Sequence, residues 1–121
     1  MLFDIMVLNN DVVKNNDDYI GDPTEIALYE CLENLVDIDK LRQENERIGE
    51  IPFDSNRKMM STINKSKNRL RLYTKGSFDS LINCCSYILE NNEIIKLTND
   101  KIDLLKSIEE EEANKAYRVL A

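Results

Sequence analysis

The sequence predicts an α+β fold in which helices flank an antiparallel β-sheet. Three consecutive extended segments predict the sheet, at residues 47–53, 57–63 and 69–74, and short polar turns separate them. Strands joined by short connections pair antiparallel, because parallel strands need a long crossover between them. Apolar residues recur at helical spacing before and after these segments, which predicts the flanking helices. A chain of 121 residues suits one domain with one modest core.

The predicted strands are separated by turns of distinct composition. Residues 54–56 are Asp, Ser and Asn, whose short side chains favour turns by bonding to nearby backbone. Residues 64–68 are also polar and are predicted as the second turn. The last strand alternates apolar and polar residues, so we expect it to be half buried. One face of that strand would carry Leu70, Leu72 and Thr74.

The helix before the sheet has a clear start. Asp22 can cap it, Pro23 suits its first position, and Glu25 lies three residues after the cap. We expect this helix to extend to about Val36. Its apolar face would carry Leu28, Leu32, Leu35 and Val36. Residues 37–46 are highly charged and fit either a loop or a frayed helix.

Helices are also predicted after the sheet. Apolar residues recur at helical spacing over residues 78–85, and Ile88 or Leu89 continues the pattern. A last helix is predicted to be capped by Thr98 or Asn99. Its inward face would carry Ile102, Leu105 and Ile108.

The remaining segments are short or polar. Residues 1–8 are mostly apolar and predict a short helix, and residues 9–21 predict a loop. Within that loop, residues 12–13 fit a short extended piece. Residues 93–97 predict a short strand, and residues 117–121 predict the start of another strand.

Composition argues against several classes of protein. The net charge of −7 argues against a nucleic-acid partner, since nucleic-acid-binding domains are normally basic. The sequence has no histidine, and its three cysteines form no CxxC pair, so we expect no metal site. We expect reduced thiols, with Cys84 and Cys85 on a helix and one of them inward. No apolar run approaches the roughly 18 residues that span a bilayer, so we expect no direct membrane contact.

The stretch from residue 49 to residue 61 favours a nucleotide ligand. It reads GEIPFDSNRKMMS and brings an aromatic ring, Phe53, near the cations Arg57 and Lys58. A ring face beside cations suits a ligand that is flat at one end and anionic at the other. The three glycines of the chain form neither a P-loop nor a GxGxxG motif. A nucleotide would therefore be held mainly by its base, with side-chain cations near its phosphates.

Four strings, in this order, resemble the nucleotide-binding domain of P-type ATPases. They are GDPTEIAL at 21–28, GEIPFDSNRKMMS at 49–61, YTKGSFDSLINCC at 73–85 and YRVLA at 117–121. The similarity is to the type II branch, which pumps calcium and other cations. It implies that residues 1–121 are the nucleotide-binding domain of a larger membrane pump, on the cytoplasmic side of the membrane.

The resemblance also implies roles for individual residues. Phe53 takes the place of the ring that stacks on adenine, and the alternative is a core phenylalanine. Lys58, on the strand after the turn, takes the place of a pocket lysine, and the alternative is a solvated lysine. Lys75 and Gly76 match a Lys-Gly pair that lines the pocket floor. The alternative is that the glycine only ends its strand.

Four further residues match positions around the nucleotide. Glu25 takes the place of a glutamate near the adenine edge, although its place in a capping box needs no ligand. Arg118 matches an arginine directed at the phosphates, and Leu120 matches a nearby wall residue. Met60 would also line the pocket, unless it is plain core.

The resemblance implies binding without catalysis by this chain. The family phosphorylates an aspartate in a DKTGT motif with ATP and magnesium, and that motif is absent from these residues. We therefore expect the chain to bind ATP and present it to a phosphorylation domain. Its partners would be the phosphorylation and actuator domains of the same pump, and calcium is the expected cation. The alternative is an acidic docking module that has lost nucleotide binding.

Overall fold

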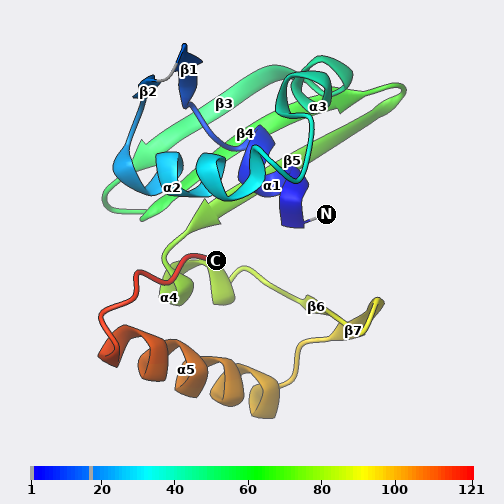
Figure 1. The fold of residues 1–121 in the computed structure, drawn as a ribbon. Helices are drawn as coiled ribbons and strands as arrows, with labels where there is room; N and C mark the ends of the chain where they lie inside the picture. Colours follow the sequence, from blue (N-terminus) through cyan, green and yellow to red (C-terminus); the bar gives the residue numbers. More distant parts are fainter. Residues whose placement is uncertain (1, 17) are drawn as a thin grey trace. The chain divides into compact units, whose positions relative to one another are not determined.

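The computed structural model describes residues 2–16 and 18–121, which form two compact units (Figure 1). The first unit comprises residues 1–53 and 60–74, and the second comprises residues 54–59 and 75–121. Short antiparallel sheets alternate with helices along the chain. The predicted α+β class is therefore confirmed.

The three predicted central strands form a sheet in the order β3-β4-β5. These strands are β3 (Glu46–Asp54), β4 (Met59–Ser66) and β5 (Arg69–Gly76). The predicted turn at residues 64–68 is wrong in length, because β4 continues to Ser66. Asn64 is 3% exposed and its Nδ2 donates to the Asn45 carbonyl at 3.0 Å, which holds this polar residue in the strand.

Three helices belong to the first unit: α1 (Leu2–Leu8), α2 (Pro23–Leu32) and α3 (Ile38–Glu44). The first two were predicted. For residues 37–46, where either a loop or a frayed helix was expected, the structure has a helix. Asp22 caps α2, because its side chain accepts from the Thr24 amide at 2.8 Å. The predicted end at Val36 is wrong. The chain turns after Leu32, and Leu35 is consequently 65% exposed.

The core of the first unit lies on one face of the sheet. Tyr73 of β5 is buried and packs with residues of α1, α2 and α3, which gather on the same side of the sheet (Figure 1). The predicted alternation in β5 left open which face is buried, and Leu70 and Leu72 are 66% and 61% exposed. Successive side chains of β5 point to opposite faces, as predicted. The face that packs against the helices is the one that carries Tyr73 and not the one that carries the two leucines.

Buried asparagine contributes to this core in a way that a hydrophobic pattern does not reveal. Asn9 follows α1 and is fully buried, and its Nδ2 donates to the carbonyls of Met60 and Tyr73 at 3.1 and 3.0 Å. One side chain thus connects the end of α1 to both β4 and β5.

Removing this amide should destabilise the first unit strongly. We expect Asn9→Ala to lower the free energy of unfolding by about 2–4 kcal/mol, because two carbonyls lose a buried donor. Urea unfolding measures the change. Asn68→Ala, in the exposed β4–β5 turn, is the matched control and should change stability by no more than about 0.5 kcal/mol. Equal effects of the two variants would contradict the role of Asn9.

A small hairpin lies in the predicted loop. It consists of β1 (Val13–Asn15) and β2 (Asp18–Ile20), which pair antiparallel with Val13 opposite Ile20. The extended piece expected at residues 12–13 is thus part of a larger element. Glu33, just after α2, contacts both strands. Lys14 Nζ lies 2.6 Å from its Oε2, and the Tyr19 hydroxyl donates to its Oε1 at 2.7 Å.

The Glu33 cluster makes the hairpin sensitive to acid. The bonds from Lys14 and Tyr19 hold the pKa of Glu33 below its ordinary value of 4.5, because both favour the ionised carboxylate. Stability from a lowered pKa is present above the ordinary value and is lost as pH falls through the lowered one. We expect the amide protection factors of β1 and β2, which compare the observed exchange rate with that of an unfolded chain at the same pH, to fall as pH falls below 4.5. Glu33→Gln should abolish that dependence, and an unchanged acid response in this variant would contradict the assignment.

The second unit contains α4 (Phe78–Ile82), β6 (Tyr87–Glu90), β7 (Glu93–Lys96) and α5 (Asn99–Asn114). The predicted continuation of helix to Ile88 or Leu89 is wrong, because these residues pair with β7 in an antiparallel hairpin. Asn91 and Asn92 turn this hairpin with φ of 50° and 68°, values typical of a tight two-residue turn. Left-handed asparagines thus override the helical spacing of the apolar residues.

Two other expectations for this unit are wrong. Cys84 and Cys85 follow α4 and are both exposed, so neither thiol points into a core. Helix α5 begins at Asn99 after Thr98, as predicted, but it has no buried residue. Ile108, expected to face inward, is 48% exposed. Within the described residues, no helix is long and apolar enough to cross a membrane.

Candidate functional site

The predicted nucleotide-site residues are divided between the two units. The first unit contains Glu25, Phe53 and Met60, and the second contains Lys58, Lys75, Gly76, Arg118 and Leu120.

Phe53 lies one residue before the end of β3 and presents its ring to solvent. Its side chain is 63% exposed, the behaviour of a contact surface and not of a core residue. The alternative that Phe53 is a core phenylalanine is therefore wrong. An exposed aromatic face is available for stacking without any rearrangement of the first unit.

Lys58 lies in the turn and not on the following strand. The Asp54 carboxylate accepts from the amides of Asn56 and Arg57, both at 2.8 Å, and the Lys58 amide donates to the Asp54 carbonyl at 2.6 Å. Lys58 closes this turn with φ of 54°, and β4 begins at Met59. The predicted place of Lys58 on the strand is wrong, because β4 begins at Met59, two residues after the predicted start.

Gly76 is required by close packing within the second unit. The Lys58 carbonyl accepts from the Ser77 amide at 2.9 Å, which presses Gly76 against Lys58 and Met59. A Cβ at Gly76 would collide with the Lys58 carbonyl oxygen and lie 2.7 Å from Met59 Cγ. The lack of a side chain at Gly76 thus allows close packing against Lys58 and Met59 of the same chain. Lys75, one residue earlier, is half-buried and engages other described residues.

The end of the chain joins the same cluster. Ala121 and Gly76 exchange backbone hydrogen bonds of 3.0 and 2.9 Å, the pattern of two residues facing each other in antiparallel strands. The strand predicted at residues 117–121 pairs only through Ala121, and no strand is formed over 117–120. Arg118 is exposed and Leu120 is 38% exposed. The second unit therefore brings together Lys58, Gly76 and the terminal segment that carries Arg118 and Leu120.

Two predicted residues of the first unit are engaged by the protein itself. The Glu25 carboxylate accepts from the Asp11 amide at 3.0 Å, and its carbonyl accepts from Asn10 Nδ2 at 2.9 Å. Met60 is 5% exposed, so its side chain lies in the core, as the alternative interpretation has it. Direct contact of either residue with a nucleotide stays a prediction.

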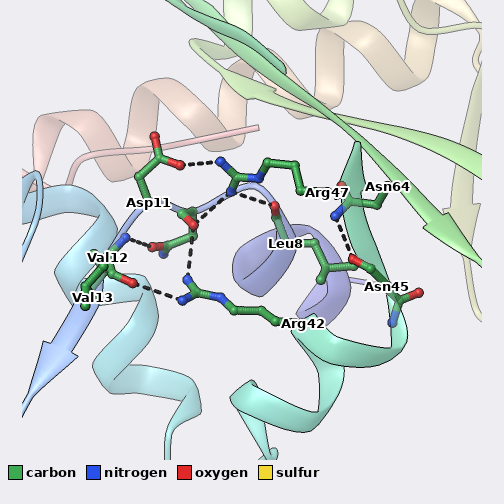
Figure 2. A pocket seen from close by; sticks show the side chains of 9 residues that line it. Leu8, Asp11, Val12, Val13, Arg42, Asn45, Arg47 and Asn64 are labelled. Atoms are coloured by element: carbon green, nitrogen blue, oxygen red, sulfur yellow. Dashed lines mark hydrogen bonds and ion pairs between the residues drawn. The ribbon is translucent and has the colours of Figure 1, made fainter. Parts of the chain in front are cut away.

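Sequence reasoning missed a second polar site, in the first unit. A cavity of about 280 Å³ is lined by Leu8, Asn10, Asp11, Val12, Val13, Arg42, Asn45, Arg47 and Asn64. Figure 2 shows both guanidinium groups directed at the loop after α1. The sequence carries no signal for this cavity, because the residues that line it come from segments far apart in the chain. No group of three or more metal-binding side chains lies together in the part of the chain that the structure describes.

Comparison with known proteins gives a consistent result. A family model described as P-type ATPase, cytoplasmic domain N, matches residues 1–121. The calcium-transporting ATPase 1 of Bacillus cereus is 43% identical over 109 residues, which cover 88% of this chain and 12% of that protein. A calcium-transporting ATPase of Listeria monocytogenes is 40% identical over 122 residues, 99% of this chain and 14% of that protein.

More distant relatives include other cation pumps. The sodium/potassium exporting P-type ATPase 1 of Saccharomyces cerevisiae is 32% identical over 130 residues, which cover 83% of this chain and 12% of that protein. The chain thus spans between 12% and 14% of the length of these relatives.

Proposed function

We propose ATP binding as the function of this chain, from the premise that the chain belongs to the P-type ATPase cytoplasmic domain N family. The exposed ring of Phe53 is the single observation that carries the proposal, since a large apolar face on a strand end is a stacking platform. Adenine stacks on this ring, and the Glu25 carboxylate lies at the adenine edge.

In this proposal, cationic residues of the second unit bind the phosphates. Lys58, Lys75 and Arg118 supply positive charge, and Gly76 fixes the turn that carries Lys58. Ammonium groups bind phosphate as compact point charges, without the amide cradle of a P-loop. Because few side chains hold the ligand, we expect weak binding, with a dissociation constant on the order of 0.1–10 mM.

The domain acts as one part of a pump in this proposal. ATP with magnesium is presented to a phosphorylation domain, and the actuator domain is a further partner in the same protein. Two relatives reported above are calcium-transporting ATPases, and we infer from them that the larger protein transports a cation, with calcium as the expected one. The chain spans only 12–14% of these relatives, so transport belongs to the larger protein.

Titration with ATP tests the proposal in this chain. We expect saturable amide shifts at Phe53 and at residues 75–76, and ADP should produce the same pattern with or without magnesium. Lys75→Gln should weaken ATP binding about tenfold, the effect of one hydrogen bond to a charged group. Lys65→Gln, an exposed lysine of β4, should leave affinity unchanged. A chain that responds to neither nucleotide would instead support the docking module.

A further inference from the structure

Two adjacent thiols are exposed in the segment between α4 and β6. Cys84 and Cys85 lie two and three residues after the end of α4, and β6 begins at Tyr87 (Figure 1). Both thiols are free and exposed to solvent. The third cysteine, Cys31, lies on α2 in the first unit and is also exposed. The chain therefore contains one adjacent pair of accessible thiols and one isolated thiol.

Both thiols of the pair lie beside carbonyls of the last turn of α4. Cys84 Sγ donates to the Ser80 carbonyl at 3.7 Å, and Cys85 Sγ donates to the Leu81 carbonyl at 3.4 Å. Ser80 and Leu81 are consecutive residues of one helix, so the two side chains return to the same end of α4. Thiols are weak donors, so a ligand that replaces these two hydrogen bonds loses little stabilisation.

A divalent metal ion does not fit this pair. Structural zinc takes a full set of protein ligands, and no group of three or more metal-binding side chains lies together among the described residues. Metal ions also bind the thiolate form. Partial desolvation, and to a smaller extent the neighbouring Cys84, raises the pKa of the Cys85 thiol. The pair therefore favours a ligand that takes two sulfur atoms and removes the thiol protons as water.

We propose that Cys84 and Cys85 bind a trivalent arsenical that carries one organic substituent. Trivalent arsenic forms three bonds, so a single carbon substituent leaves two bonds for sulfur, a soft donor that suits a soft acceptor. In the reaction with phenylarsine oxide, two As–S bonds form and the arsenic–oxygen bond breaks. The oxygen leaves as water with the two thiol protons. Arsenic stays trivalent and neither sulfur is oxidised, so the step needs no further reagent.

The two thiols act together because they belong to adjacent residues. Once the first As–S bond forms, the second thiol meets the arsenic at a high effective concentration, so the chelate is held more tightly than two separate bonds. An isolated thiol such as Cys31 gives one bond, which free monothiols replace. The bound product adds no charge, so the net charge of −7 does not oppose binding. The site uses other residues than the proposed ATP contacts.

Phenylarsine oxide tests this proposal in the unmodified, reduced chain. Intact-mass spectrometry measures the adduct in the presence of excess glutathione, a monothiol that displaces arsenic from single thiols. We expect a single adduct per chain, which the dithiol dimercaptopropanol removes. Amide shifts should centre on Cys84 and Cys85 and leave Cys31 unchanged. The absence of an adduct that survives glutathione, or shifts at Cys31 alone, would overturn the proposal.

Single substitutions separate the pair from the third thiol. Cys84→Ser and Cys85→Ser should each lower the glutathione concentration that removes half of the arsenic by at least about a hundredfold, because the chelate becomes a single bond. Cys31→Ser is the matched control, since it removes an equally exposed thiol, and it should leave that concentration unchanged. A folded Cys84→Ser or Cys85→Ser chain that retains arsenic as strongly as Cys31→Ser would overturn the proposal. If a variant does not fold, the amide shifts of the unmodified chain still decide.

Discussion

Phe53→Ala is expected to weaken ATP binding by about five- to a hundredfold, the largest effect of any single substitution at the proposed site. The reason is that ring-on-base stacking contributes about 1–3 kcal/mol and no P-loop compensates for its loss. Because the side chain is 63% exposed, its removal should change the free energy of unfolding by less than about 1 kcal/mol. The loss of affinity is measured by ATP titration, followed by amide shifts.

The matched control for this prediction is Phe3→Ala. Phe3 is 45% exposed on α1 and provides an aromatic ring of the same size on another element. We expect this variant to bind ATP like the unmodified chain. If the ATP affinity of Phe53→Ala were unchanged, or if both variants lost affinity equally, the proposed stacking of adenine on Phe53 would be wrong.

Gly76→Ala should destabilise the second unit by about 1–3 kcal/mol, the usual cost of forcing an extra methyl group into a packed site. The added Cβ would meet the Lys58 carbonyl oxygen, and Met59 Cα would lie 2.9 Å away. Both neighbours are backbone atoms that cannot swing aside. The turn that positions Lys58 must therefore shift, and we expect ATP affinity to fall together with stability. Urea unfolding followed at residues 78–114 measures the first effect.

Gly49→Ala provides the control for backbone entropy. Its Cβ would lie 3.5 Å from Ile63 Cδ1, an ordinary van der Waals contact. Replacing glycine where there is room leaves stability unchanged or raises it by up to about 1 kcal/mol. If Gly76→Ala were as stable as Gly49→Ala, the packing role of Gly76 would be wrong.

The elements that were predictable are those with strong local chemistry. Asp22 before Pro23 placed the start of α2, and the polar run after Phe53 placed the end of β3 to within one residue. Periodicity failed where the backbone conformation of a few residues overrides it. Asn91 and Asn92 convert an apparent helix into the β6–β7 hairpin, and the positive φ of Lys58 lengthens a turn.

Burial was harder to predict than secondary structure. Alternation in β5 identified two faces but not which one the helices cover, and Tyr73 decided against Leu70 and Leu72. The polar cavity was invisible for a related reason. Asn64 and Arg42 lie 22 positions apart in the sequence, and only the packing of the first unit lets both line one cavity.

An intermolecular NOE experiment on this chain with ATP tests the central claim most directly. Stacking places the adenine H2 and H8 protons within NOE distance of the Phe53 ring, so we predict cross-peaks between these protons and the ring in the presence of ATP. Saturable ATP binding with adenine cross-peaks to other aromatic rings, and none to Phe53, would contradict the account.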